Sequence, residues 1–386
     1  MSGSSTGAAA AKSGKKSVVV LYNHVGEDWY EKLRELDEVP LDFEPEYPVT
    51  DTATVKEEHD EIARALRREG YRARAVNVAN DLRVVERVIK RSRPDVIFNL
   101  VEFFHDDAGL ESAIAALFDL YEIPYTGAPP FGLELCQRKG LAKMVLEDFG
   151  VPTPRFQIVY SPNVPDRLKL RYPLIVKPAW EDASMGVGEG SVVHDVEGLA
   201  ARLRHVYDEF EQPILVEEFI EGRELHVSVW GNEAIEVLPP IEFDFTNLPP
   251  GHPHLISYEA KWDPLAEIYH RIHTLCPARL TERQLRKVED VAVLAYEATE
   301  CRDYGRVDIR LRGATPYVLE VNPNPDLTES VSFMESAEAA GYTFAQALAE
   351  IVEMAAARKA PSGPAVSVPG DPPSPRLERL FRKKLN

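Results

Sequence analysis

Apolar strands and amphipathic helices alternate along the first third of the chain. Residues 17–22 (SVVVLY) have the continuous apolar character of a buried strand, and residues 55–70 (VKEEHDEIARALRREG) have the period of a helix. Two more strands and one more helix follow, over residues 72–78, 81–92 and 94–100. Strands joined by helices form parallel sheets that are covered on both faces, so we expect a doubly wound α/β unit over residues 17–130.

Beyond residue 130 the spacing becomes less regular and predicts mixed sheets. A helix runs through Lys139 to Phe149, and short strands follow at residues 156–160 and 174–177. We expect this central unit to cover residues 131–212. A third unit, over residues 213–358, contains the apolar runs ILVEEFI, HVSVWG and AIEVLP, the helical pattern LRKVEDVAVLAYEATE and a closing helix.

The two ends of the chain have the composition of tails. Residues 1–16 are small and polar, which predicts a disordered segment that cannot bury a core. Residues 359–386 hold six prolines between Pro361 and Pro375 and end in the basic stretch RLERLFRKKLN. We expect an extended linker and a solvated tail, because one short basic segment is too little for stable anchoring to a membrane.

Composition narrows the class of protein. The 386 residues are 44% hydrophobic and 28% charged, enough for a large core. A net charge of -19 argues against general nucleic-acid binding, which needs Lys and Arg to neutralise phosphates. The sequence has no run of eighteen apolar residues and no secretory pattern at its start, so we expect a cytoplasmic protein. Cys136, Cys276 and Cys301 are too scattered to predict a disulfide framework or a zinc site.

Two alternating runs over residues 305–322 (GRVDIRLRGATPYVLEVN) flank a turn and predict an antiparallel hairpin. Strict alternation sends Val307, Ile309, Leu311, Leu319 and Val321 to the core. It places on the polar faces Arg306, Asp308, Arg310, Glu320 and Asn322. Two carboxylates and an amide oxygen suit a hard cation such as magnesium. An ordinary charged hairpin that faces water explains the same pattern, and the hairpin alone does not decide between them.

Two more segments have the composition of a nucleotide site. Lys177 ends the strand PLIVKP, and Gly186, Gly188 and Gly190 follow at alternate positions, where backbone N–H groups could approach phosphate oxygens. The spacing matches neither the Walker pattern nor the dinucleotide fingerprint, so a mobile loop without a ligand is the competing explanation. Around the turn at Gly222, the acidic residues of ILVEEFIEGRELHVSV could accept ribose hydroxyls, or could form a solvated edge.

Taken in order, these segments resemble the ATP-grasp superfamily, and within it the D-alanine–D-alanine ligase-like branch. The resemblance covers roughly residues 96 to 355. It rests on IPYTG, the helix lysine Lys139, LIVKPAWEDASMGV, LVEEFIEGRELHVSV, SYEAKW, CPARL, GRVDIRL and LEVNPNP. The fold it implies is the N-terminal parallel sheet followed by two ATP-grasp subdomains, the second of which carries the hairpin. Agreement of so many spaced segments favours a nucleotide site over the separate explanations given above.

The resemblance also implies roles for individual residues. ATP would be bound by Lys139, Lys177, Ser184, Met185, Gly186, Glu217, Glu218, Phe219, Ile220, Glu224, Lys261 and Leu319. In this set the two first lysines contact phosphates, the glycine loop is a phosphate lid, residues 217–220 bind adenine and Glu224 binds the ribose. Two magnesium ions, which manganese could replace, would be held by Asp308, Glu320 and Asn322. Catalytic roles fall to Lys261 on the transferred phosphate and Arg306 on the developing oxyanion.

Departures from the family pattern gather where that branch grips its two D-alanines. LYNHVGEDWYEKL replaces a GGxSxExxVS-like segment, Ala183 replaces a serine and Trp262 a tyrosine, although these three places normally hydrogen-bond together. Asp326 and Val331 replace a glycine and a serine. We therefore expect an intact nucleotide site and a remodelled acceptor site lined by Glu102, His105, Asp326 and Glu329. The added acids favour a cationic acceptor. His105 with Asp106 and Asp107 is interpreted as a hydrogen-bonded loop and not as a zinc site.

The resulting hypothesis is an ATP- and magnesium-dependent ligase that forms an amide or peptide bond through an acyl phosphate. Its partners would be a small acid and an amine, with no nucleic acid and no stable membrane anchoring, and a homodimer is an open option. Two other functions stay open from the sequence. One is true D-alanine–D-alanine ligation, which the changes at Asp326 and Val331 disfavour. The other is a non-catalytic ATP-binding regulator, which retention of all the charged site residues disfavours.

Overall fold

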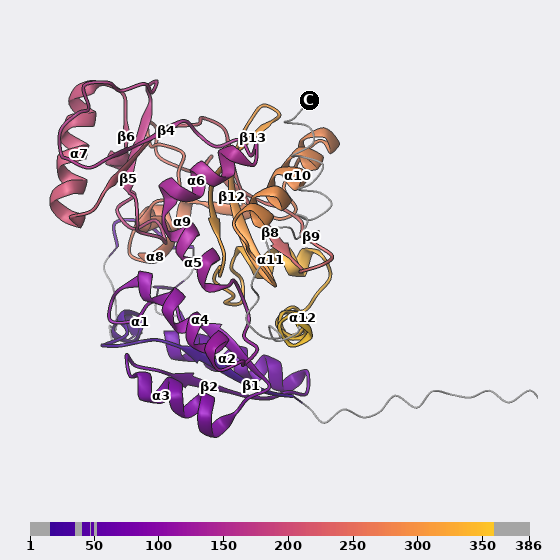
Figure 1. Ribbon diagram of the computed structural model, residues 1–386. Helices are drawn as coiled ribbons and strands as arrows, with labels where there is room; N and C mark the ends of the chain where they lie inside the picture. Colours follow the sequence, from indigo (N-terminus) through magenta and orange to yellow (C-terminus); the bar gives the residue numbers. More distant parts are fainter. Residues whose placement is uncertain (1–15, 35–40, 47, 50–51, 359–386) are drawn as a thin grey trace, which may run out of the picture.

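The computed structural model describes residues 16–34, 41–46, 48–49 and 52–358, and Figure 1 shows their arrangement. The tail predicted over residues 1–16 lies outside this part except for its last residue, and the linker and basic stretch predicted over residues 359–386 lie entirely outside it. No helix in the described ranges is both long and apolar enough to cross a membrane.

The N-terminal unit is built on a parallel sheet of order β2-β1-β3, formed by Ser17–Tyr22 (β1), Arg72–Asn77 (β2) and Val96–Leu100 (β3). One face packs on α2 (Val55–Arg68) and on α12 (Phe344–Ala357), the last described helix of the chain. The other face packs on α3 (Leu82–Arg87), the π-helical turn Val88–Ser92 and α4 (Glu111–Leu120). The predicted doubly wound arrangement is confirmed, because β1 and β3 bury side chains on both faces.

A four-stranded antiparallel sheet of order β4-β7-β5-β6 forms the central unit. Its strands are Phe156–Val159 (β4), Leu174–Pro178 (β5), Val192–Val193 (β6) and Ile214–Glu218 (β7). Helix α7 (Val196–Phe210) covers one face through Leu199, Leu203 and Val206. This sheet corrects the boundary that we predicted at residue 213. That boundary would assign β7 to the third unit, whereas β7 pairs with β4 and β5 of the central unit. The sequence of an apolar strand does not indicate which sheet the strand will join, because the choice of partner strands depends on the tertiary fold.

The third sheet is also antiparallel and has the order β11-β10-β8-β12-β13, with β9 paired to β8. Its strands are Arg223–Trp230 (β8), Glu236–Val237 (β9), Ile241–Asp244 (β10), His273–Leu275 (β11), Tyr304–Arg312 (β12) and Thr315–Asn322 (β13). Helix α10 (Glu282–Ala298) packs on its core face, and α11 (Ser332–Ala339) contacts β8 and β10. The long central strands β8 and β12 place charged residues on the opposite face.

Shorter helices connect these layers. α5 (Pro130–Gln137) and α6 (Lys139–Asp148) link the N-terminal unit to the central sheet, and α6 also touches β13. Three more short helices lie in loops between strands, namely α1 (Trp29–Arg34), α8 (Tyr258–Trp262) and α9 (Glu267–Arg271). In Figure 1 the central sheet with α7 projects to the upper left, above the N-terminal unit. The hairpin β12–β13 lies between the central sheet and α10.

The hairpin itself is confirmed, with one departure from strict alternation. Asp308 pairs with Glu320, and the next residue of β12, Ile309, pairs with Val318. Leu319 therefore has no partner on β12 and forms a β-bulge. Val318 is fully buried in the core and Leu319 instead lines the pocket described below. The prediction that Leu319 faces the core is therefore wrong. The bulge adds one residue to β13, and this extra residue lets Glu320 stay opposite Asp308 while an apolar side chain also reaches the pocket.

Candidate active site

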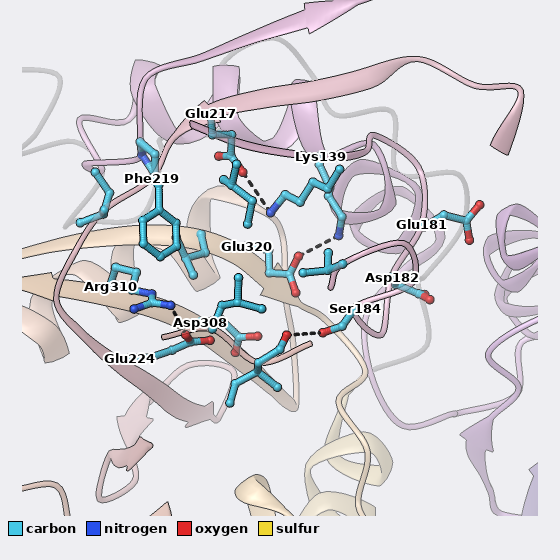
Figure 2. Close-up of a pocket in the computed structure, with 18 of the residues that line it drawn as sticks. Lys139, Glu181, Asp182, Ser184, Glu217, Phe219, Glu224, Asp308, Arg310 and Glu320 are labelled. Carbon is cyan, nitrogen blue, oxygen red and sulfur yellow. Dashed lines mark hydrogen bonds and ion pairs between the residues drawn. The ribbon is translucent and has the colours of Figure 1, made fainter. Parts of the chain in front are cut away.

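A pocket of about 800 Å³ lies between the central sheet, the glycine loop and the hairpin. Figure 2 shows acidic and basic side chains converging on it from β5, β7, β8, β12 and β13. Most of the residues proposed for ATP and metal line it, namely Lys139, Lys177, Ser184, Met185, Glu217, Glu218, Phe219, Ile220, Glu224, Lys261, Asp308, Leu319 and Glu320. Gly186, Arg306 and Asn322 do not line it. The fold thus gathers in one cavity residues that lie up to 181 positions apart in the sequence, from Lys139 to Glu320.

Cations crowd the end of the pocket next to the hairpin. Lys139 begins α6 and its Nζ lies 2.7 Å from Glu320 Oε2. Burial alone would raise the pKa of Glu320, but Lys139, Lys177 and Lys261 outweigh it and hold that pKa well below its usual range. Burial, reinforced by Arg306, lowers the pKa of Lys261. A concentration of positive charge in a protein pocket suits a polyanion such as a triphosphate.

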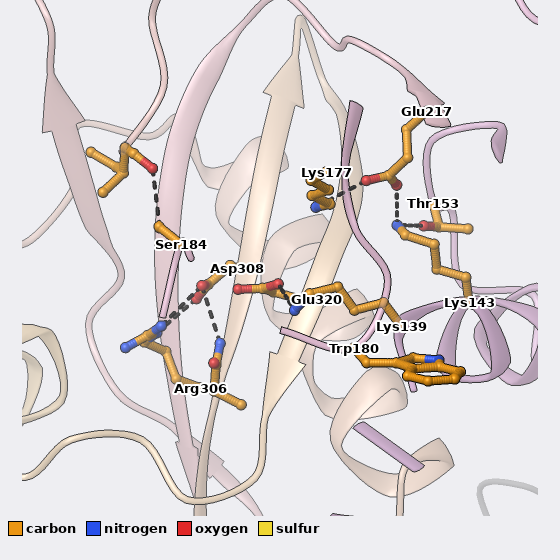
Figure 3. Close-up of polar contacts among 12 residues, drawn as sticks. Lys139, Lys143, Thr153, Lys177, Trp180, Ser184, Glu217, Arg306, Asp308 and Glu320 are labelled. Carbon is orange, nitrogen blue, oxygen red and sulfur yellow. Dashed lines mark hydrogen bonds and ion pairs between the residues drawn. The ribbon is translucent and has the colours of Figure 1, made fainter. Parts of the chain in front are cut away.

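Asp308 accepts hydrogen bonds from two neighbouring side chains. The guanidinium of Arg306 donates to it from Nε at 2.7 Å and from Nη2 at 3.0 Å, and Asn322 Nδ2 donates to Oδ2 at 3.1 Å (Figure 3). Burial acts to raise the pKa of Asp308, yet Arg306 and then His226 lower it overall. Asp308 is only 5% exposed, so the alternative of an ordinary hairpin facing water does not describe this strand.

The donor set of the hairpin fits a hard divalent cation. Asp308 and Glu320 offer carboxylate oxygens directly across the strand pair, and Asn322 can offer its amide oxygen. In the described ranges no three His, Cys, Asp or Glu side chains are arranged to hold a metal by themselves. Water and substrate phosphates would have to complete the shell, which is the usual way in which magnesium is bound. The positive charge of Arg306 balances the carboxylate of Asp308, and that of Lys139 balances the carboxylate of Glu320.

Part of the pocket wall is apolar. Phe219 and Ile220 belong to it, and we call the part around them the apolar end. Ile175, Met185 and Leu319 add further apolar groups to the lining, and such walls suit the flat faces of a nucleotide base. The segment 217–220, which we call the connector, already uses two of its backbone donors. Glu218 N donates to the Arg155 carbonyl at 2.9 Å and Phe219 N to the Pro173 carbonyl at 2.9 Å. The connector is therefore fixed by its neighbours in the central sheet.

Glu217 and Glu224 are buried, at 1% and 6% exposure, which rules out a solvated acidic edge. Glu224 Oε2 lies 2.6 Å from Arg310 Nη2, and Arg310 in turn stacks over Phe219 at 5.2 Å from the ring centre. Burial, more than Asp308, raises the pKa of Glu224 although Arg310 opposes the shift. A buried carboxylate beside the apolar end is well placed to accept hydroxyl groups of a sugar.

The glycine loop lies folded over the pocket. Ser184 Oγ donates to the Ile256 carbonyl at 3.1 Å and Tyr258 N donates to the Val187 carbonyl at 2.9 Å. Gly186 has a positive φ of 68°, and a Cβ there would lie 2.8 Å from Phe210 and Pro178. The glycine is thus needed for close packing against Phe210 of α7 and Pro178 of β5, and its role at a nucleotide stays a prediction. Ser184 and Met185 do reach the pocket.

Acidic groups next to this pocket also act on one another, and one of them, Asp182, lines it. Glu102 follows β3 and its side chain is exposed. Partial loss of hydration next to the surrounding protein, reinforced by Asp326, Asp182 and Glu58, raises its pKa to about 8. Burial and then Asp326 also raise the pKa of Glu58 to about 8. Burial raises the pKa of Glu111 well above its usual value, although Asn324 donates to it at 2.9 Å.

The four expected acceptor residues separate in the structure. Glu102 and Asp326 belong to this acidic group, and Asp326 Oδ1 also accepts from the backbone and the hydroxyl of Thr328. His105 is exposed and packs edge-on against Phe104, while Glu329 is exposed, and neither is among the charges that act on Glu102. Glu58, Glu111 and Asp182 were missed, because they lie in three segments with no shared motif.

The sequence of this chain is similar to those of known ligases. The family model "D-ala D-ala ligase C-terminus" matches residues 145–353. A D-alanine–D-alanine ligase of Carboxydothermus hydrogenoformans is 32% identical over 306 residues, which cover 76% of this chain and 90% of that protein. The chain belongs to the D-alanine–D-alanine ligase family. This family is a branch of the ATP-grasp ligases, and the chain is accordingly an ATP-dependent carboxylate–amine ligase.

Two further similarities extend the family assignment. The uncharacterized protein y4sG of Sinorhizobium fredii is 34% identical over 261 residues, covering 67% of this chain and 74% of that protein. The crystal structure of a D-alanine–D-alanine ligase from Bacillus anthracis complexed with ATP superposes with a TM-score of 0.64 at 20% identity, over 88% of this chain and 97% of that one. This likeness confirms the ATP-grasp fold.

In this ligase the glycine loop is held by contacts that involve Trp262 and Tyr30. Trp262 Nε1 donates to the Ala183 carbonyl at 2.9 Å, and the hydroxyl of Tyr30 donates to the Trp262 carbonyl at 3.3 Å. The three places where the sequence departs from the family pattern therefore still meet. The indole N–H and a backbone carbonyl replace a contact between side chains, so the loss of the serine at Ala183 leaves the lid held in place.

Two buried residues of the ligase were missed from the sequence. His226 lines the pocket on β8, with Nδ1 2.8 Å from Ser332 Oγ and Nε2 3.5 Å from Asp308 Oδ2. Burial lowers the pKa of His226 to about 3, so its ring is neutral. Lys143 lies behind the pocket and contacts Glu217. A lysine or histidine inside a regular element gives no sign that its side chain will be buried, whereas its pairing with acids from distant strands does.

Proposed function

We propose that this ligase joins a small acid to a cationic amine through an acyl phosphate, using magnesium and ATP. The observation that supports this most is the polar end of the pocket, where Lys139, Lys177, Lys261 and Arg306 surround the paired carboxylates of Asp308 and Glu320. A triphosphate bridged to these carboxylates by a divalent cation would neutralise both sets of charges at once.

The reaction divides into two displacements. A carboxylate oxygen of the acid attacks the terminal phosphorus of ATP, the bond from that phosphorus to the bridging oxygen breaks, and ADP leaves. The amine nitrogen then attacks the carbonyl carbon of the acyl phosphate and loses a proton. The tetrahedral intermediate collapses to an amide with release of inorganic phosphate. Most of the rate gain would come from positioning and from fixed charges that face the developing negative charge.

Named residues can supply these charges. Asp308, Glu320 and Asn322 would hold magnesium, or manganese in its place, and the metal would supply a Lewis acid on the phosphate oxygens. Lys139 and Lys177 would bind phosphate oxygens, Lys261 would follow the transferred phosphoryl group, and Ser184 with Met185 would cover it. Arg306 would move from Asp308 to the oxyanion, since its planar fork can serve either partner.

The apolar end would take the nucleoside. Phe219, Ile220 and Leu319 would contact the adenine faces, with Glu217 and Glu218 at its edge. Glu224 would accept the ribose hydroxyls. Because this ligase consumes ATP, we also propose the cytoplasm as its location, and a homodimer stays a prediction.

The acceptor part of the proposal rests on the charges around Glu102. Glu58, Asp182 and Asp326 all raise the free energy of its ionised form, and a bound cation would relieve that repulsion. The second carboxylate-bearing D-alanine of a true D-alanine–D-alanine ligase would meet these acids unfavourably. An amine with an additional positive charge, such as a basic amino acid or a polyamine, suits this group of acids better.

A substrate screen tests this part directly. Release of ADP and phosphate would be measured with magnesium, ATP and pairs drawn from amino acids and polyamines, and we expect turnover that depends on both members of a pair. The best acceptor should carry an extra positive charge. Rapid turnover with D-alanine alone would favour the true D-alanine–D-alanine ligase. Silence across the panel, with ATP binding demonstrated separately, would favour the non-catalytic regulator.

The pH dependence of acceptor binding gives a second test. Glu102 and Glu58 are mostly protonated below their pKa of about 8 and become ionised above it. We therefore expect the KM for a permanently charged acceptor to fall as pH rises from about 6.5 to about 8.5. Glu102 is exposed and therefore screened by solvent, so the midpoint should lie at or below that pKa. Glu102→Gln should flatten the profile, and a wild-type KM that rises with pH would contradict the proposed role of these acids.

A further inference from the structure

Lys143 is a buried cation that lies outside the pocket lining. It sits one helical turn after Lys139 on α6, and it is only 1% exposed. Its Nζ donates to Thr153 Oγ1 at 2.8 Å and lies 2.6 Å from Glu217 Oε1 (Figure 3). Burial lowers its pKa, although Glu217 opposes the shift. A buried ammonium costs several kcal/mol unless it is paired, so its presence points to the group that it holds.

Glu217 is held between two lysines. Its Oε1 faces Lys143 and its Oε2 lies 2.9 Å from Lys177 Nζ, while β7 fixes its backbone in the centre of the central sheet. Burial would raise the pKa of Glu217, but Lys143 and Lys177 outweigh it and lower that pKa. The carboxylate therefore stays ionised at the wall of the pocket. An ionised carboxylate accepts hydrogen bonds and cannot donate one.

An acceptor at the base end of the pocket distinguishes between purines. Adenine presents an exocyclic amino group, which donates, where guanine presents a carbonyl oxygen, which accepts. We propose that Lys143 is a positioning residue that fixes the Glu217 carboxylate as the acceptor for the amino group of adenine. Through Glu217, Lys143 sets the preference of this ligase for ATP over nucleotides that lack this amino group. The inference rests on the proposed ATP site.

The contacts behind Lys143 explain how its position is kept. Thr153 Oγ1 accepts from Lys143 and donates to the Val318 carbonyl at 2.8 Å, so the ammonium is tied to the hairpin as well as to β7. Lys177 alone reaches Glu217 from the neighbouring strand β5. Without Lys143, the carboxylate would be held at one oxygen only and could turn toward Lys177. The acceptor would then leave the edge of the base.

Nucleotide binding by the whole chain tests this role. A non-hydrolysable ATP analogue and its counterpart without the 6-amino group would be titrated calorimetrically into wild type, Lys143→Met, Glu217→Gln and the double variant. We expect Lys143→Met to weaken the ATP analogue by about tenfold or more, the loss of one charged hydrogen bond. Binding of the counterpart should change little. In the Glu217→Gln background the same change should add nothing, because Lys143 acts through Glu217.

Controls separate this role from a structural one. Lys169→Met removes an exposed lysine and should bind both nucleotides like wild type. If Lys143→Met does not fold, Thr153→Val keeps the lysine but removes its support, and should weaken the ATP analogue alone by about threefold. Equal weakening of both nucleotides, or no weakening of either, would overturn the inference. Failure of wild type to bind the ATP analogue would instead refute the proposed function.

Discussion

Glu320→Ala is expected to remove magnesium-dependent turnover, with a fall in kcat on the order of a thousandfold. Glu320 provides one of the two carboxylates of the hairpin, and three lysines keep it ionised at any pH near neutrality. Its loss removes a proposed metal ligand and also leaves Lys139 without the partner that lies 2.7 Å away. Steady-state kinetics over a range of magnesium concentrations would measure the effect.

Two matched variants make the Glu320 result specific. Glu338→Ala removes an exposed glutamate of α11 and should leave kcat unchanged. Glu224→Ala removes a buried carboxylate from the nucleoside end and should mainly raise the KM for ATP. Equal and small effects at Glu320 and Glu224 would mean that the hairpin is structural, and the proposed metal site would be wrong.

Arg306→Met is expected to lower kcat by about a hundredfold to a thousandfold while ATP still binds. The guanidinium donates through two N–H groups to both oxygens of Asp308, one of the proposed metal ligands. Rapid-quench measurement of a single turnover would locate the loss in the chemical steps. Arg306→Lys should recover little, because an ammonium cannot reproduce the fork. A loss confined to the KM for ATP would contradict a role at the oxyanion.

The sequence was sufficient for the parts of the site that lie on regular strands. Alternation along residues 305–322 placed Asp308 and Glu320 on one face, and the motif order led to the family that the comparisons confirm. Alternation failed at Leu319 because a bulge inserts one residue, and a bulge has no reliable signature in a single sequence. The assignment of β7 failed for a related reason, since pairing partners are chosen by the whole fold.

The group of acids around Glu102 could be predicted only in part. Asp326 departs from the family motif and Glu102 follows a predicted strand, so both could be proposed from the sequence. Three further acids could not, because Glu58, Glu111 and Asp182 come from α2, α4 and the glycine loop. Their shifted pKa values depend on the approach of three units in space, which local patterns do not encode. Lys143 was missed in the same way, because only the packing of α6 against the central sheet buries it.

Transfer of oxygen from the acid to phosphate tests the central claim most directly. With the acid and amine identified by the screen, the acid would be labelled with ¹⁸O at both carboxylate oxygens, and the products analysed by mass spectrometry or ³¹P NMR. An acyl phosphate route predicts ADP and one ¹⁸O atom in each inorganic phosphate, with the other retained in the amide. Unlabelled phosphate, or AMP and pyrophosphate in place of ADP, would contradict the account.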